Sequence, residues 1–234
     1  MSYSPGTYDA WYERPFGRYA DRLEKNLVTK LLPEVNRKLI LDVGCGTGKY
    51  SIMLAMMGAY VVGVDSQLPM VAVAKERSRN LRLDLEVVIS DAGTLPFRAE
   101  VFDLSVSILA LCFIRLPRRA VEEMRRATKQ RGGLIVGTLN KWSPYGIGKK
   151  IRSLFIESSY RHALFHTPFE LMRLVGAEDW HSTIFGLEWM PKWLLEALYP
   201  FDNQLGRIFK PFGAFLATKV VILTAPAKAV INKV

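Results

Sequence analysis

LILDVGCGTGKY, which spans Leu39–Tyr50, is the stretch that decides the fold of this chain. An apolar run leads into glycines at alternate positions, and an apolar-periodic segment follows from Tyr50 to Met57. This order predicts a strand, a tight loop and a helix. Glycine lets a ligand approach the main chain closely, and the N-terminus of a helix favours an anionic group. We therefore expect a nucleotide-like ligand above Gly44 to Gly48.

The spacing of the glycines separates two classes of ligand. The dinucleotide fingerprint is G-x-G-x-x-G, whereas Gly44, Gly46 and Gly48 form G-x-G-x-G and are preceded by Asp42. This pattern resembles motif I of the class I S-adenosylmethionine (SAM)-dependent methyltransferases. The resemblance implies that Asp42, these three glycines and Cys45 belong to a SAM site, with S-adenosylhomocysteine as the product. A glycine turn without a ligand is the alternative interpretation.

A second acidic residue follows the next predicted strand. Tyr60–Val64 is a β-branched run that ends at Asp65, roughly twenty residues after the first glycine, as one β-α-β crossover requires. A carboxylate at the carboxyl edge of a parallel sheet can accept hydrogen bonds from both ribose hydroxyls. We predict Asp65 as the ribose ligand, Ser66 beside it at the start of the next helix, and Met70 on the wall of the adenine slot. A turn or helix-capping role for Asp65 is the alternative.

A third acidic residue, Asp91, follows the predicted strand Leu85–Ser90. The sequence SDAGTLPF, which begins at Ser90, resembles the methyltransferase stretch in which an Asp accepts a hydrogen bond from the adenine amine and the backbone of its neighbour contacts a ring nitrogen. The resemblance implies these roles for Asp91 and Ala92. A carboxylate suits this position because the amine is only a donor. A simple turn before Gly93 is the alternative for Asp91.

The fourth predicted strand, Phe102–Ser107, is followed by Ile108, which we also assign to the cofactor site. In methyltransferases that modify exocyclic base amines or glutamine, this strand ends in an Asn- or Asp-Pro-Pro-aromatic motif. Here the run is Ser-Ile-Leu-Ala-Leu. The missing motif counts against methylation of a base or of glutamine.

Two segments are expected to cover the site. The segment of about residues 8–32 resembles the N-terminal cofactor cover of small-molecule methyltransferases. The resemblance implies that Tyr8 and Tyr19 close over the cofactor. The alternative for each ring is that it packs a helix against the sheet. Residues 141–166, about, lie where substrate covers are inserted and are basic. His166 and Tyr145 are weak candidates to orient or deprotonate an acceptor, but no catalytic base is assigned. No metal site is expected, because His162 and His166 lack a third ligand nearby.

The complete pattern predicts an α/β fold. We expect one domain over residues 1–234, with a doubly wound, Rossmann-like sheet of about seven strands and helices on both faces. The strands are mostly parallel, with Gly213–Leu223 as an antiparallel edge strand. The closest resemblance is to the small-molecule branch that includes the quinone-ring C-methylating enzymes.

Composition limits the function less than the motifs do. The net charge of +10 and a pI near 9.7 permit an anionic partner without requiring one. Two cysteines and no segment of ~18 apolar residues favour a cytoplasmic protein without a transmembrane segment. We expect a small-molecule acceptor, aromatic or anionic. An RNA methyltransferase with a basic surface, a non-catalytic SAM-binding protein and an NAD-dependent oxidoreductase remain alternatives, and the oligomeric state stays open.

Overall fold

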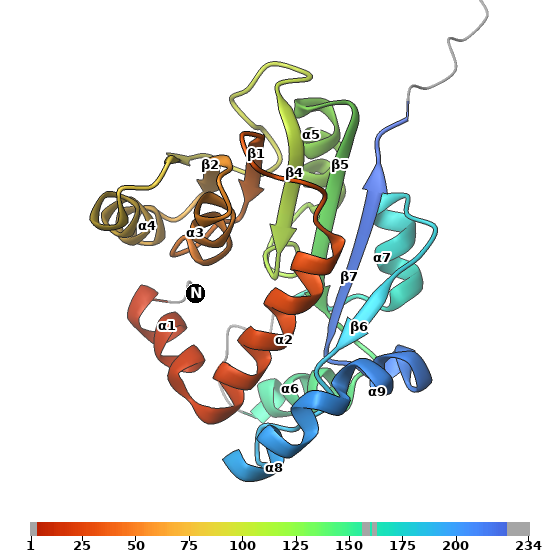
Figure 1. Ribbon diagram of the computed structural model, residues 1–234. Helices are drawn as coiled ribbons and strands as arrows, with labels where there is room; N and C mark the ends of the chain where they lie inside the picture. Colours follow the sequence, from red (N-terminus) through yellow and green to blue (C-terminus); the bar gives the residue numbers. More distant parts are fainter. Residues whose placement is uncertain (1–3, 156–159, 161–162, 224–234) are drawn as a thin grey trace, which may run out of the picture.

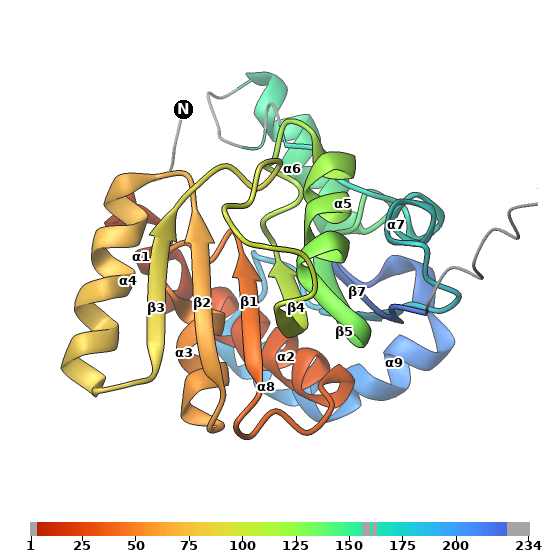
Figure 2. The ribbon, with the colours of Figure 1, turned by 90° about the horizontal axis from the view of Figure 1, so that it is seen from above.

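The computed structural model describes residues 4–155, 160 and 163–223. A seven-stranded sheet forms its centre, in the order β3-β2-β1-β4-β5-β7-β6. Figure 1 and Figure 2 show the sheet from two directions. The strands are β1 Leu39–Val43, β2 Tyr60–Asp65, β3 Leu85–Ile89, β4 Phe102–Ile108, β5 Thr128–Leu139, β6 His181–Thr183 and β7 Phe215–Val221.

Strand β1 lies at the point where the chain changes direction across the sheet. It pairs in parallel with β2 on one side and with β4 on the other (Figure 2). The successive crossovers therefore run outward from β1 in both directions. In open α/β sheets such a switch point leaves a crevice at the carboxyl ends of the strands, where ligands bind.

Strand β7 is antiparallel to its neighbour β5, as predicted for this segment. The prediction made it the edge of the sheet, but the structure places the three-residue strand β6 outside it, also in antiparallel pairing. The doubly wound fold, mostly parallel, with helices around the sheet, is confirmed.

Helices cover both faces of the sheet and bury two apolar clusters. One cluster joins the sheet to α2, α3 and α4, and the other joins it to α5 and α7. Because both faces are covered, the central strands are almost continuously apolar. Ile40, Leu41 and Val43 of β1 are completely buried, and each such side chain contributes about 1.5–3 kcal/mol relative to exposure. The helices are α1 Pro5–Glu13, α2 Pro15–Leu31, α3 Lys49–Met56, α4 Leu68–Leu81, α5 Pro117–Ala127, α6 Pro144–Phe155, α7 Pro168–Val175, α8 Lys192–Leu198 and α9 Asp202–Ile208.

Helix α6 begins earlier than the sequence pattern suggested. The pattern predicts a helix over 148–159, whereas α6 begins at Pro144 and is described to Phe155; residues 156–159 lie outside the described residues. Helices α8 and α9 were not expected, because the aromatic residues of that segment show no regular spacing. Within the described residues, no helix combines the length and apolar character needed to cross a lipid bilayer.

Candidate cofactor and acceptor site

The glycine loop between β1 and α3 folds tightly against β2. The N–H groups of Gly44 and Cys45 both donate to the carbonyl oxygen of Val64, at 2.7 and 3.0 Å. Gly44, Gly46 and Gly48 have φ angles of 77°, 55° and 84°, which side chains with a Cβ rarely adopt. A Cβ on Gly44 would also lie 2.2 Å from the Cβ of Ala110. The loop therefore requires glycine where its backbone meets the cavity.

A cavity of about 760 Å³ opens at the carboxyl edge of the sheet, within the size range of small-molecule sites. Its wall changes character along the order of the strands. Beyond β1, β2 and β3 it is mainly polar, and beyond β4, β5, β7 and β6 it is mainly apolar and aromatic, with the charged Arg115 beside Ile114. The polar part is formed by Gly44, Gly46, Asp65, Ser66, Gln67, Ser90, Asp91 and Ala92, together with Met70. The apolar part includes Phe16, Leu109, Phe113, Ile114, Leu139, Tyr145, Tyr160, Ile184 and Ala214, with Ile108 between the two parts.

Asp65, at the end of β2, makes the turn contacts that the sequence offered as one interpretation, and it also lies on the cavity wall. Its carboxylate lines the cavity. Its Oδ2 also accepts from the N–H of Gly46 at 3.0 Å, and its Oδ1 accepts from the N–H of Gln67 at 2.9 Å. Each carboxylate oxygen can accept a further hydrogen bond. Asp65 therefore fixes the glycine loop and still offers acceptors to a ligand.

Asp91 lies on the cavity wall just beyond β3. Its Oδ1 accepts from the N–H of Gly93 at 2.7 Å, so that the carboxylate closes a tight turn. Ala92, the next residue, also lines the cavity. The turn holds this carboxylate and the backbone beside it at one end of the polar wall.

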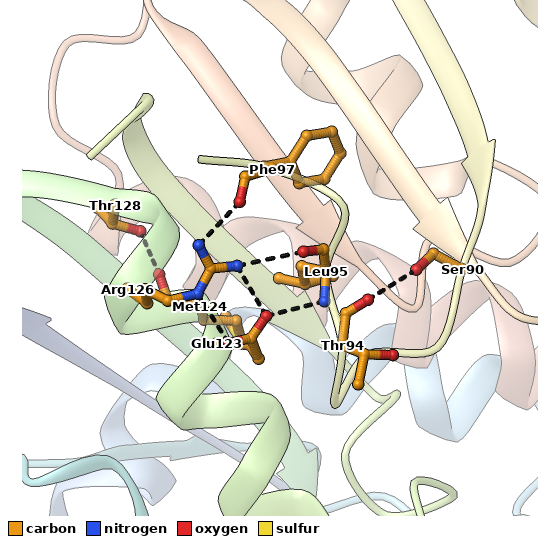
Figure 3. A network of polar contacts seen from close by, with 8 residues as sticks. All are labelled: Ser90, Thr94, Leu95, Phe97, Glu123, Met124, Arg126 and Thr128. Atoms are coloured by element: carbon orange, nitrogen blue, oxygen red, sulfur yellow. Dashed lines mark hydrogen bonds and ion pairs between the residues drawn. The ribbon is translucent and has the colours of Figure 1, made fainter. Parts of the chain in front are cut away.

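A network of charged hydrogen bonds anchors the loop after Asp91 to α5 (Figure 3). Arg126 donates to the carbonyl oxygens of Phe97 at 2.8 Å and Leu95 at 3.1 Å. Glu123 accepts from Nε of Arg126 at 2.7 Å and from the N–H of Leu95 at 2.8 Å. The hydrogen bond to Arg126 lowers the pKa of Glu123, so this carboxylate stays ionised. The network fixes the loop that carries Asp91.

Asp42 lies beneath the glycine loop and is not part of the described cavity wall. Its Oδ2 accepts from the hydroxyl of Ser51 at 2.6 Å. Burial raises the pKa of Asp42 to about 6, and the hydrogen bond from Ser51 opposes that shift. The contact joins β1 to α3, so Asp42 supports the loop from below. The resemblance implied that Asp42 belongs to the SAM site, but its position beneath the loop does not favour direct contact with a ligand.

Helices α1 and α2 lie along one side of the cavity and contribute residues to its wall. Tyr8 is one of these residues. Asp9 holds α1 in place, because it accepts from the hydroxyl of Thr47 at 3.0 Å and forms an ion pair with Arg77 at 2.7 Å. Helix α1 is thus attached directly to the glycine loop and to α4.

Glu24 is a charged cavity residue that sequence reasoning missed. It lines the cavity although it is only 2% exposed, and its Oε2 accepts from the hydroxyl of Tyr50 at 3.0 Å. Burial raises the pKa of Glu24 to about 7, against the opposing effects of Lys49 and of the hydrogen bond from Tyr50. Lys49 forms an ion pair with Asp21 at 2.9 Å, and burial lowers the pKa of Lys49 to about 8.

The spacing of residues along α2 is the sequence signal that could have identified Glu24. Phe16, Ala20 and Glu24 are spaced four residues apart, so they share one edge of the buried face of α2. All three line the cavity. An acidic residue in such an apolar stripe needs a partner or a ligand.

Tyr19, the second ring expected to close over the cofactor, does not lie at the cavity. It is not among the residues that line the cavity, because it lies on the other edge of the buried face of α2. Its hydroxyl donates to Oδ2 of Asp202 at 3.1 Å and accepts from the N–H of Gly186 at 3.3 Å. Tyr19 therefore connects α2 to the far edge of the sheet, and Trp11 and Tyr12 line the cavity instead.

Three other predicted residues also lie away from the cavity wall. The sulfur of Cys45 is buried and points toward Gly63, where an added Cβ would lie 2.9 Å from it. Gly48 begins α3 behind the wall, near Ala74. His166 is buried, with Nδ1 3.2 Å from the hydroxyl of Thr138, and burial lowers the pKa of its imidazole. His166 is therefore not placed to act on an acceptor in the cavity.

Tyr145, the other candidate for acceptor chemistry, does line the cavity. It is the second residue of α6 and stacks on Phe16 of α2, with ring centroids 5.4 Å apart and planes 20° apart. The segment predicted as a substrate cover thus meets the cofactor cover across the cavity. Within the described residues, no group of three or more His, Cys, Asp and Glu side chains is arranged to hold a metal ion.

The comparisons with known proteins agree with this geometry. Residues 41–136 match a family model described as a methyltransferase domain. A SAM-dependent methyltransferase of Thermotoga maritima, described as a possible histamine N-methyltransferase, has a similar structure with a TM-score of 0.70 and 25% identity, covering 93% of this chain and 95% of that one.

Sequence relatives extend the comparison. A demethylmenaquinone methyltransferase of Paenarthrobacter aurescens is 39% identical over 97 residues, which are 42% of this chain and 37% of the relative. An uncharacterised protein of Mycobacterium tuberculosis is 29% identical over 72% of this chain and 55% of its own length. The chain spans about half the length of the curated relatives it matches.

Proposed function

We propose that this chain, which belongs to the class I SAM-dependent methyltransferases, transfers the methyl group of SAM to a small apolar or aromatic acceptor. The observation that carries the proposal is the single cavity with a mainly polar part beyond β1, β2 and β3 and a mainly apolar and aromatic part beyond β4, β5, β7 and β6. A methyl donor and an acceptor must lie end to end for transfer, and this division provides one place for each.

The residues of the polar part fit the donor. Gly44 and Gly46 leave an open backbone surface that a Cβ at Gly44 would disturb. Asp65 offers carboxylate oxygens to the ribose hydroxyls, and Asp91 offers them to the adenine amine, as the resemblance implied. The buried carboxylate of Glu24 is positioned to accept from the ammonium group of the methionine tail, since this cation is the strongest donor of that tail.

The residues of the apolar part favour a flat or apolar acceptor. Tyr145, Tyr160 and Phe113 are aromatic residues that line this part of the cavity. SAM supplies a methyl group activated by its sulfonium, and transfer is an in-line displacement. The chain then has to align the acceptor and exclude water, which the two covers do by meeting over the cavity. The relatives described as demethylmenaquinone methyltransferases support a ring-bearing acceptor.

Binding is tested first, by calorimetry with SAM, S-adenosylhomocysteine and NAD. We expect both SAM and its product to bind and NAD not to bind. Binding of NAD alone would contradict the donor assignment, and it would favour the oxidoreductase alternative.

Transfer is tested next, with SAM labelled on the methyl group and with quinols, phenols and an oligoribonucleotide as acceptors. Label transferred to a ring-bearing acceptor would support the proposal, whereas transfer to the oligoribonucleotide would favour the RNA alternative. Tyr145→Ala is expected to lower turnover at least about tenfold with SAM affinity nearly unchanged, because the ring positions the acceptor. Phe169→Ala, at an exposed ring on α7, is the matched control.

A further inference from the structure

Helix α6 carries an apolar stripe on its solvent side. Ile147, Ile151, Leu154 and Phe155 follow the spacing i, i+4, i+7 and i+8, which places them on one face of the helix. Their exposed fractions are 48%, 53%, 73% and 83%. Tyr145, by contrast, is buried at the cavity. The stripe that normally packs against a core faces water here.

Two exposed tryptophans lie at the same end of the molecule as this stripe. Trp189 and Trp193 are 76% and 69% exposed, on α8 and the turn before it. An ion pair of 2.7 Å between Lys149 of α6 and Glu188 ties the two segments together. Figure 1 places α6 and α8 at the end of the molecule toward which the arrow of β4 points. Large exposed apolar side chains gathered at one end indicate an interaction surface.

The cations of α6 differ in what they contact. Lys149 is ion-paired with Glu188, and Lys150 donates to the carbonyl oxygens of Tyr160 and Ala163, whereas Arg152 is exposed. Lys192 of α8 is also exposed, beside Glu196, 3.6 Å away. An exposed apolar helix stripe with a basic residue at its side is typical of helices that lie in the interface of an anionic bilayer. The net charge of +10 adds a long-range attraction to such a surface.

We propose that the α6–α8 face, formed by Ile147, Ile151, Leu154, Phe155, Trp189 and Trp193, binds the surface of an anionic lipid bilayer. The helix lies in the plane of the interface, with its apolar stripe among the acyl chains and Arg152 among the headgroups. This attachment does not depend on the proposed methyl transfer. If both hold, the apolar part of the cavity lies next to the lipid phase, because Tyr145 belongs to the same helix.

Sedimentation of the full chain with vesicles tests the proposal. The vesicles are phosphatidylcholine alone or an equal mixture with phosphatidylglycerol. We expect binding to the mixture, weaker binding to phosphatidylcholine, and loss of binding as salt increases. Leu154→Ser with Phe155→Ser should lower partitioning to the mixture at least about tenfold. The matched control is Met56→Ser with Leu81→Ser, which alters two exposed apolar residues at the opposite edge, where β2 and β3 begin.

A second pair of substitutions tests the charges separately. Arg152→Glu with Lys192→Glu should weaken binding to the mixture without changing an apolar side chain. Circular dichroism and calorimetry with SAM check that each variant is folded. Equal binding by the wild type and the Leu154–Phe155 variant would overturn the proposal, as would equal binding to both vesicles. Failure of the wild type to bind either vesicle would overturn the proposal as well. If the wild type then formed dimers, and the Leu154–Phe155 variant did not, the face would instead join two copies of this chain.

Discussion

Asp65 accepts a hydrogen bond from the backbone N–H of Gly46 at 3.0 Å, across 19 residues of sequence. This contact joins the end of β2 to the middle of the glycine loop. The same carboxylate lies on the cavity wall. The residue proposed to hold the ribose is therefore also the residue that fixes the loop beneath the ligand.

Replacing Asp65 should separate these two roles. Asp65→Ala removes the acceptors for the ribose and is expected to weaken SAM binding by roughly 10- to 100-fold, since hydrogen bonds to a charged group contribute about 1.5–3 kcal/mol. Folding should lose only about 1 kcal/mol, because the loop is also held by Val64. Asp65→Asn keeps one acceptor for Gly46 and serves as the comparison. Calorimetry and urea unfolding measure the two effects, and an unchanged SAM affinity in Asp65→Ala would overturn the assignment.

Glu24 should make stability depend on pH. Burial raises its pKa in the folded chain to about 7, above its ordinary value of 4.5. As pH rises from 4.5 to 7, the unfolded chain releases this proton while the folded chain keeps it, so the free energy of unfolding falls. Glu24→Gln removes the effect and should be more stable than the wild type at pH 8 by about 1–3 kcal/mol, with little difference at pH 4.5.

Urea unfolding of both proteins at pH 4.5, 6 and 8 measures this difference. Asp42, whose pKa burial raises to about 6, acts with the same sign and is present in both proteins, so its contribution cancels. The same variant should bind SAM more weakly than the wild type at pH 8, where Glu24 is ionised. A stability difference that stays constant from pH 4.5 to 8 would show that Glu24 is not protonated in the folded chain.

Tyr19 should matter for stability and not for the cofactor. Its hydroxyl donates to buried Asp202, which also accepts from Thr183 and from the N–H of Ile184. Tyr19→Phe removes one of these donors and should cost about 0.5–1.5 kcal/mol of unfolding free energy. SAM affinity should change by less than about twofold, because the ring lies outside the cavity wall. A loss of affinity as large as that of Asp65→Ala would restore Tyr19 to the cofactor site.

The parts of the fold that the sequence predicted well depend on local patterns. Strands β1, β2 and β3 are short apolar runs with Gly44, Asp65 and Asp91 at or just beyond their ends, and the glycine spacing favours a tight loop. The sequence could place Asp65 and Asp91 at one edge of the sheet because the carboxyl ends of these parallel strands meet there.

The parts that could not be predicted depend on packing between distant segments. Tyr19 and Glu24 lie on the same buried face of α2, and only the tertiary arrangement decides which edge meets the cavity. His166 is the last residue of the predicted substrate cover, yet it is buried against Thr138 of β5. Strand β6 has three residues, too few for an alternating pattern, so its position outside β7 left no mark in the sequence.

Helix α1 lies beside the polar part of the cavity, yet none of the residues in Pro5–Glu13 is fully buried. Its described contacts include the carboxylate of Asp9, shared between Thr47 and Arg77, the ring of Tyr12 beneath Lys49, and Trp11 against Phe16. Segments with little buried apolar surface open at a smaller free-energy cost than the rest of the fold. We therefore expect a ligand beneath α1 to enter and leave by displacing this short helix, while the sheet and its carboxylates stay in place.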